Sequence, residues 1–97
     1  MIQLDPVSME IVKDILKKYL PNQRVVAFGS RVKGTKKPFA DLDLCIMNDQ
    51  PLSIEEIGDL REAFSESDLP IRVDIIEWAS LTPDFKEEVN QAYEDLN

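Results

Sequence analysis

Hydrophobic residues recur at helical spacing in three stretches of the chain, with polar residues between them. Each stretch starts with a signal typical of a helix N-terminus. The first and last have a capping residue followed by proline, and the second has a serine three residues before a glutamate. The pattern therefore predicts helices that begin at Asp5-Pro6, Ser53 and Thr82-Pro83 and end at Leu20-Pro21, about Ser67 and about Leu96. The last helix is expected to carry Tyr93 and Leu96 on its apolar face.

Three other stretches are short, apolar and rich in β-branched residues, which predicts strands at residues 24–28, 41–47 and 71–78. A short helix is expected at residues 30–34. The resulting order, α-β-(α)-β-α-β-α, indicates an α/β fold with a small mixed three-stranded sheet covered by helices. With 97 residues, the chain is expected to form a single domain.

Aspartates interrupt two of the predicted strands. The helix between the second and third strands has the length of a crossover connection, so these strands are expected to be parallel neighbours. Because side chains alternate across a strand, Asp41 and Asp43 share one face, and Asp74 can lie beside them. Like charges in such a cluster repel each other, and Mg²⁺ binds carboxylate oxygens while leaving positions for phosphates. Two such ions would clamp the attacking and leaving oxygens of an in-line displacement.

A Gly-Ser pair precedes these aspartates, at the junction of the first strand and the short helix. Backbone N–H groups at such a junction can bind an anion, and Gly29 allows close approach of a phosphate. Ser30 adds a hydroxyl donor. Four of the eleven basic residues follow within seven positions, which predicts a phosphate-facing rim formed by Arg31, Lys33, Lys36 and Lys37.

Composition narrows the possible chemistry. The net charge of −8 argues against direct nucleic-acid binding, which needs basic patches. Histidine is absent and Cys45 is the only cysteine, which excludes His-dependent catalytic triads and disfavours zinc. Cys45 is expected to be a small core residue. The chain shows no long apolar run and no signal-peptide pattern, so a cytoplasmic protein without membrane contact is expected.

The spaced residues match the motif of a known family: Gly29-Ser30, ten further residues, Asp41-x-Asp43, and later Asp74. With them, the chain resembles the DNA polymerase beta-like nucleotidyltransferase superfamily, and most of all its minimal nucleotidyltransferase branch. The resemblance covers about residues 8–97. It departs from the family at Ala40, where serine is common.

The resemblance implies a role for each matching residue. Gly29 and Ser30 would hold the triphosphate of ATP, Asp41 and Asp43 would bind two Mg²⁺ ions, and Asp74 would bind one ion and help to activate the incoming hydroxyl. Minimal members of this kind work with a separate helical protein of the HEPN type. The resemblance therefore implies an antitoxin that transfers AMP to a tyrosine of its HEPN-type toxin, in a hetero-oligomer.

Other interpretations of the same residues remain open. Asp41 and Asp43 could be a solubility device at a strand edge, and Asp74 could pair with Arg72 at the surface. Arg31 could be a surface charge, and Lys36 and Lys37 a solvated loop. At the level of function, the chain could neutralise its partner by binding alone, or modify a small molecule in a pocket that a partner completes.

Overall fold

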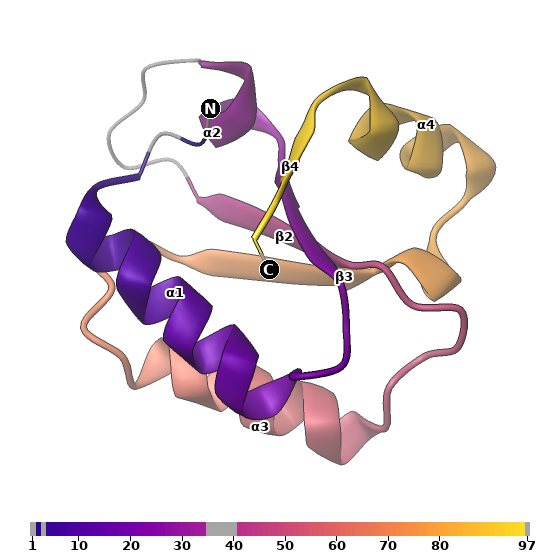
Figure 1. The fold of residues 1–97 in the computed structure, drawn as a ribbon. Coiled ribbons are helices and arrows are strands. Elements are labelled where there is room, and N and C mark those ends of the chain that lie inside the picture. Colours follow the sequence, from indigo (N-terminus) through magenta and orange to yellow (C-terminus); the bar gives the residue numbers. More distant parts are fainter. Residues whose placement is uncertain (1, 3, 35–40, 97) are drawn as a thin grey trace.

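The computed structural model describes residues 2, 4–34 and 41–96 (Figure 1). Its helices are α1 (Pro6–Tyr19), α2 (Ser30–Lys33), α3 (Ile54–Ser65) and α4 (Pro83–Gln91), with a 3-10 turn η1 (Trp78–Ser80). Its strands are β1 (Val25–Phe28), β2 (Leu42–Ile46), β3 (Val73–Glu77) and β4 (Tyr93–Asp95). The predicted strands and the first three helices lie where the sequence pattern places them, within a few residues at their ends.

The strands form one mixed sheet in the order β3-β2-β1-β4. β2 pairs with β3 in parallel, and β1 pairs with β2 and β4 in antiparallel fashion. The predicted fold class is therefore confirmed, but the predicted number of strands is wrong by one. The additional strand is β4, which closes the edge of β1.

The chain leaves the helical conformation earlier than its spacing predicts. α4 ends at Gln91, and Ala92 adopts an extended backbone with φ −157° and ψ 113°. β4 then pairs with the edge of β1, and Leu96 enters the core with 4% of its surface exposed. Tyrosine also favours strands over helices. Strand pairing and burial of Leu96 thus decide the conformation of a segment whose spacing fits a helix.

Arg24, which directly precedes β1, contacts two residues of β4. Its Nε donates to a carboxylate oxygen of Asp95 at 2.7 Å, and its guanidinium lies over the ring of Tyr93, 5.6 Å from the ring centre. Both contacts require Tyr93 and Asp95 to be extended along β1. They therefore support the strand against the predicted helix.

Apolar side chains cover both faces of the sheet. Figure 1 shows α1 and α3 side by side beneath one face, where Leu16, Leu44 and Leu60 are among the fully buried residues. A smaller cluster on the other face packs beneath α4 and contains Val26, Phe28, Cys45 and Val89. Burial raises the pKa of the Cys45 thiol to about 11, so the prediction that Cys45 is a core residue is confirmed.

The three predicted helix starts are confirmed. The Asp5 carboxylate accepts a hydrogen bond from the backbone at the start of α1, at 2.7 Å. Ser53 and Glu56 form a reciprocal capping box at α3, and Thr82 caps α4 ahead of its proline. These caps satisfy backbone N–H groups that a helix start leaves without partners.

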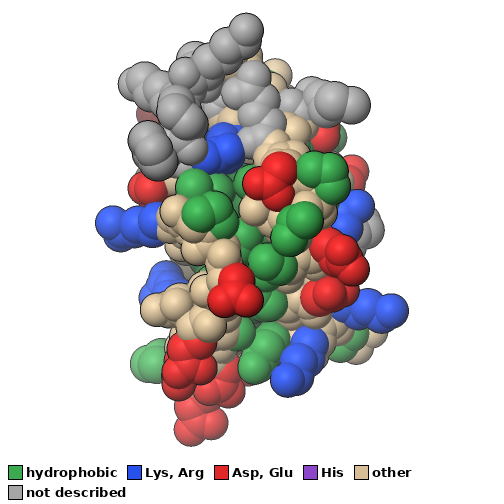
Figure 2. Space-filling view, turned by 90° about the vertical axis from the view of Figure 1, so that its left-hand side faces the viewer, with side chains coloured by type: hydrophobic (Ala, Val, Ile, Leu, Met, Phe, Trp, Pro, Cys, Tyr) green, Lys and Arg blue, Asp and Glu red, His purple; other side chains and the backbone are tan. Residues whose placement is uncertain are grey.

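The surface where α1 begins and α3 ends carries mixed charges. Figure 2 shows a band of hydrophobic side chains there, bordered by separate acidic and basic groups. Among the described residues seen on this face, the acidic and basic side chains are therefore interspersed. None of the helices in the described ranges has the length and apolar character needed to cross a membrane.

Candidate active site

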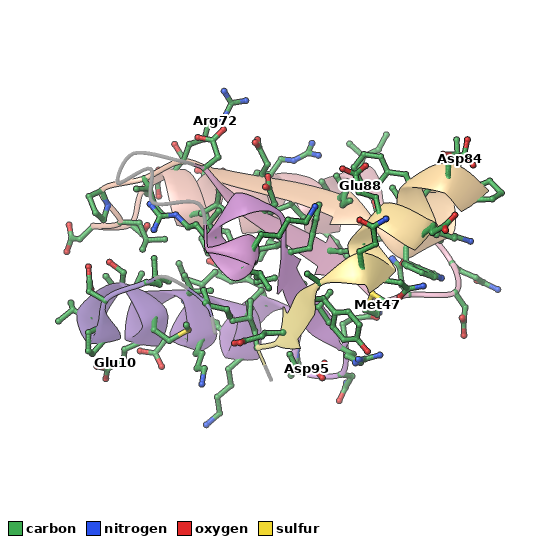
Figure 3. The ribbon with its side chains drawn as sticks, turned by 90° about the horizontal axis from the view of Figure 1, so that it is seen from above. Glu10, Met47, Arg72, Asp84, Glu88 and Asp95 are labelled. Carbon is green, nitrogen blue, oxygen red and sulfur yellow. The ribbon has the colours of Figure 1, made fainter. Side chains whose placement is uncertain are left out.

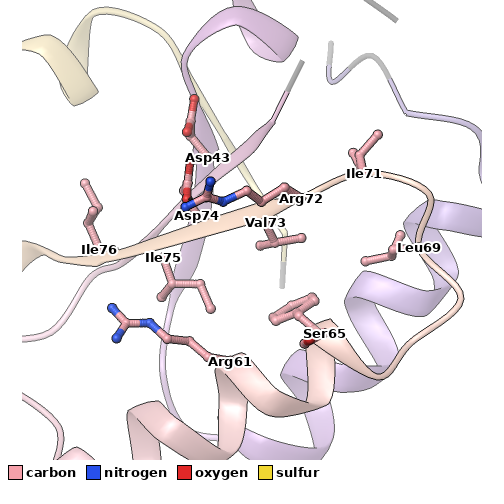
Figure 4. A pocket seen from close by; sticks show the side chains of 11 residues that line it. Asp43, Arg61, Ser65, Leu69, Ile71, Arg72, Val73, Asp74, Ile75 and Ile76 are labelled. Carbon is pink, nitrogen blue, oxygen red and sulfur yellow. Dashed lines mark ion pairs between the residues drawn. The ribbon is translucent and has the colours of Figure 1, made fainter. Parts of the chain in front are cut away.

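Two carboxylates lie side by side on neighbouring parallel strands. Asp43 of β2 and Asp74 of β3 are direct partners in the ladder, which confirms the pairing expected from the crossover. Such partners have Cα atoms ~4.8 Å apart. Figure 4 shows both carboxylates on one side of the sheet and the side chains of Val73 and Ile75 on the other. Both carboxylates therefore face the same space, on that side of the sheet.

The environment of Asp43 disfavours its negative charge. Burial is the largest cause of its raised pKa, followed by the charges of Asp74 and then Asp41. Asp41 directly precedes β2 and is half-buried. Asp43 is thus close enough to both other predicted carboxylates to be repelled by them, and a proton or a cation at Asp43 relieves the repulsion.

Gly29 brings the end of β1 against the Asp43 carboxylate. Its φ is +81°, a conformation that L-residues with a side chain rarely adopt. A Cβ placed on Gly29 would collide with the Asp43 side chain. The position therefore needs glycine for two reasons, its backbone conformation and the lack of space beside Asp43.

The predicted phosphate-binding residues follow Gly29 directly. Ser30 opens α2, and the backbone N–H groups of Val32 and Lys33 donate to the Gly29 carbonyl at 3.1 and 3.0 Å. Lys33 is exposed at the end of this short helix. The structure thus brings Gly29 next to Asp43, with Ser30 following it in the chain and Lys33 one helical turn away.

Arg31 is more enclosed than a rim residue would be, with 8% of its surface exposed. The pKa of Asp5 is lowered mainly by hydrogen bonds from Ser8, and the Arg31 charge contributes to the same effect. The guanidinium is therefore close enough to the start of α1 to affect Asp5. Lys36, Lys37 and Ala40 lie outside the described residues.

Asp74 forms an ion pair with Arg72, two residues before it in the chain. The Arg72 Nε lies 3.4 Å from Asp74 Oδ1, and the two side chains are 77% and 43% exposed. Figure 3 shows Arg72 projecting outward from the edge of the sheet. An ion pair this exposed contributes little to stability, so it leaves the Asp74 carboxylate available for other ligands.

The donor set has the right chemistry for Mg²⁺, because carboxylate oxygens are its preferred protein ligands. Among the described residues, however, no three His, Cys, Asp or Glu side chains gather closely enough to hold a metal ion. Asp43 and Asp74 are the carboxylates that the backbone register places on one face of neighbouring strands, so they are the ones that would hold such an ion.

A cavity of about 760 Å³ adjoins the two carboxylates along the edge of β3 (Figure 4). Asp43, Asp74 and Arg72 line one part of it, and Arg61 and Ser65 line another part from α3. The sequence analysis missed Arg61. Its place directly after Leu60 does not distinguish it from any other exposed residue of α3.

Comparison with known proteins agrees with the motif. A family model described as a nucleotidyltransferase domain matches residues 9–95. A curated relative, the probable protein adenylyltransferase MntA of Haemophilus influenzae, is 50% identical over 93 residues. That match covers 94% of this chain and 82% of the relative.

Solved structures show the same fold at lower identity. A toxin–antitoxin crystallised with AMP-PNP is 20% identical with a TM-score of 0.75, covering 92% of this chain and 72% of that one. A tri-AMPylated Shewanella oneidensis HEPN toxin in complex with its MNT antitoxin gives 17% identity and a TM-score of 0.70, covering 94% and 70%. The chain therefore belongs to the nucleotidyltransferase domain family, in its branch of minimal nucleotidyltransferases.

Proposed function

We propose that this nucleotidyltransferase transfers AMP from ATP to a tyrosine hydroxyl of a helical HEPN-type toxin, and so acts as the antitoxin of the pair. The observation that carries the proposal is the register that makes Asp43 and Asp74 direct partners, with Gly29 packed against Asp43. The relative that is 50% identical bears the name of a protein adenylyltransferase, which supports the same reaction.

In this proposal, different residues of the chain bind the two substrates, ATP and the acceptor hydroxyl. The turn at Gly29 and Ser30 binds the triphosphate, because a glycine there allows the backbone close to a phosphate. Lys33 and the largely buried Arg31, both on the short helix that follows, add positive charge beside it. The acceptor hydroxyl enters on the side of Asp74.

Asp41, Asp43 and Asp74 would hold two Mg²⁺ ions. When bound, these ions would neutralise charge on the phosphates and orient the reacting oxygens. The tyrosine oxygen bonds to the α-phosphorus as the bond to the bridging oxygen of pyrophosphate breaks. Asp74 accepts the hydroxyl proton, which makes the oxygen a better nucleophile. The products are an AMP-tyrosine ester and pyrophosphate.

The test uses the purified chain, its HEPN-type partner, ATP and Mg²⁺. Intact mass spectrometry should show AMP on the partner with the unmodified chain and with Asp59→Asn, a matched change of an exposed aspartate on α3. It should show none with Asp43→Asn combined with Asp74→Asn. Absence of the adduct with the unmodified chain would overturn the proposal.

The alternative is neutralisation of the toxin by binding alone. Both accounts predict a stable complex, but they differ in what the double variant does to toxicity. If the double variant still neutralises the toxin at equal concentration, binding is sufficient and the transfer is not the antitoxin mechanism. If neutralisation is lost while the complex still forms, transfer is the mechanism.

A further inference from the structure

β3 is the open edge of the sheet beside the candidate active site. Within the described residues, β2 lies on one side of β3 and no strand lies on the other. The Leu42 N–H donates to the Arg72 carbonyl at 2.9 Å. In a parallel ladder, successive residues direct their backbone N–H and C=O groups alternately toward the neighbouring strand and away from it. Because the Arg72 carbonyl faces β2, the backbone groups of Asp74 and Ile76 also face β2, and those of Val73 and Ile75 face outward. The N–H and C=O groups of these two residues can therefore receive another strand.

The cavity along this edge connects the open backbone to the acidic pair. Its lining runs from Asp43 and Asp74 on one side of the sheet to Arg61 on the other, past Val73 and Ile75 (Figure 4). An extended chain laid along β3 would fill this space. Its side chains would alternate between the carboxylates and α3.

Arg61 gives the cavity a charge preference. It is exposed and makes no ion pair with any residue in the described ranges. Its guanidinium lies on the side of β3 that is opposite the Asp74 carboxylate (Figure 4). In a chain with a net charge of −8, such a cation attracts a carboxylate from a bound segment.

The cavity and the Gly29 turn flank Asp43 from opposite directions. In the sheet order, β1 with Gly29 lies on one side of β2, and β3 with the cavity lies on the other. In-line transfer needs the leaving group and the attacking oxygen on opposite sides of the phosphorus. If the nucleotide binds at Gly29, the acceptor therefore has to approach from the side of β3.

We propose that the acceptor binds as an extended segment of the partner chain that adds a strand to the open edge of β3, with its hydroxyl at the Asp43–Asp74 pair and a carboxylate at Arg61. This inference rests on the proposed function and adds how the substrate is recognised. The main-chain hydrogen bonds to Val73 and Ile75 supply general affinity, and Arg61 supplies selectivity.

The strand period fixes where the carboxylate must lie. The hydroxyl residue faces Asp74, so residues at odd offsets from it face Arg61. A carboxylate three residues from the tyrosine should therefore bind better than one two residues away. This preference is specific to strand addition, because a helical or irregular segment has a different period.

The test uses the full chain and two synthetic nine-residue peptides. Each has a central tyrosine and β-branched residues elsewhere, with glutamates three residues from the tyrosine on both sides in one peptide and two residues away in the other. Amide hydrogen exchange of Val73 and Ile75 should slow about tenfold at a peptide concentration of ten times Kd, because only the free fraction exchanges. The amides of Asp74 and Ile76 donate to β2 and should not change.

Charge reversal tests the role of Arg61. Arg61→Glu should weaken binding of the first peptide about threefold, as expected for one exposed ion pair, and abolish its advantage over the second. Lys13→Glu makes the same charge change at an exposed position of α1, and this control variant should still bind the first peptide better than the second. Equal binding of the two peptides by the unmodified chain would overturn the inference, as would unchanged exchange at Val73 and Ile75.

The same peptides separate this inference from the function on which it rests. Slowed exchange without AMP transfer to the peptide in ATP and Mg²⁺ supports strand addition and counts against the transfer. AMP transfer without slowed exchange supports the function and overturns strand addition.

Discussion

Replacing Gly29 with alanine tests the contact that joins the end of β1 to the candidate active site. A left-handed backbone conformation costs a residue with a side chain ~1–2 kcal/mol, and Gly29 has φ +81°. The added Cβ also collides with the Asp43 carboxylate. Displacing that side chain from its rotamer costs a further ~0.5–1.5 kcal/mol.

The free energy of unfolding of Gly29→Ala should therefore fall by about 1.5–3.5 kcal/mol, which lowers Tm by about 6 °C or more in a domain of this size. Gly58→Ala is the matched control, because its Cβ meets no atom within 4 Å on α3. It should stabilise the chain by ~0.5–1 kcal/mol. Urea denaturation and thermal melts followed by circular dichroism measure both variants.

A third measurement isolates the collision. In the background of Asp43→Ala the carboxylate is absent, so Gly29→Ala should cost only the conformational ~1–2 kcal/mol. Stabilisation by Gly29→Ala like that expected for Gly58→Ala would show that neither the conformation nor the collision limits this position, and a cost that does not depend on Asp43 would rule out the collision.

The charge of Asp43, the burial of Leu96 and the capping box of α3 each make a prediction about stability. Asp43→Asn should raise the free energy of unfolding at pH 7. Burial and the neighbouring charges raise the folded pKa of Asp43 above its ordinary 3.8, so native stability falls as pH rises from that value. The gain should fade as pH approaches 3.8, as urea denaturation across this range can check. Leu96→Ala should cost ~2–5 kcal/mol in the same assay, because Leu96 is 4% exposed in the core, and a cost near zero would contradict its burial behind β4. Ser53→Ala should cost ~1 kcal/mol through loss of the capping box at α3, and an unchanged melt would contradict that role.

Local signals in the sequence were sufficient for most of the fold. Asp5, Ser53 and Thr82 predict helix starts because a capping side chain acts on backbone groups only a few residues away. The length of the α3 crossover was sufficient to predict that β2 and β3 are parallel neighbours. Hence the placement of Asp43 beside Asp74 could be predicted from one chain.

The C-terminal segment could not be predicted in this way. Phe85, Val89, Ala92 and Leu96 keep a helical spacing, which is equally compatible with burial of Leu96 from a strand. The open edge of β1, which is distant in sequence, decides the outcome. A tertiary contact of this kind leaves no local signal.

Side-chain environments were also beyond the sequence pattern. Arg31 lies in a basic stretch, which predicts a phosphate rim, yet its surface is 8% exposed. Arg61 lines the cavity although nothing in its spacing distinguishes it from an ordinary exposed arginine on a helix. Both depend on how α2 and α3 pack, which becomes visible only in three dimensions.

The proposed function depends on a magnesium-dependent ATP site that Asp43 and Asp74 would form beside the Gly29 turn. Isothermal titration calorimetry of ATP into the purified chain, with and without Mg²⁺, measures it directly. The account predicts binding that requires Mg²⁺, that persists in Asp59→Asn and that disappears when Asp43 and Asp74 are both changed to asparagine. Mg²⁺-dependent binding of equal affinity in that double variant, or no such binding in the unmodified chain, would contradict the account.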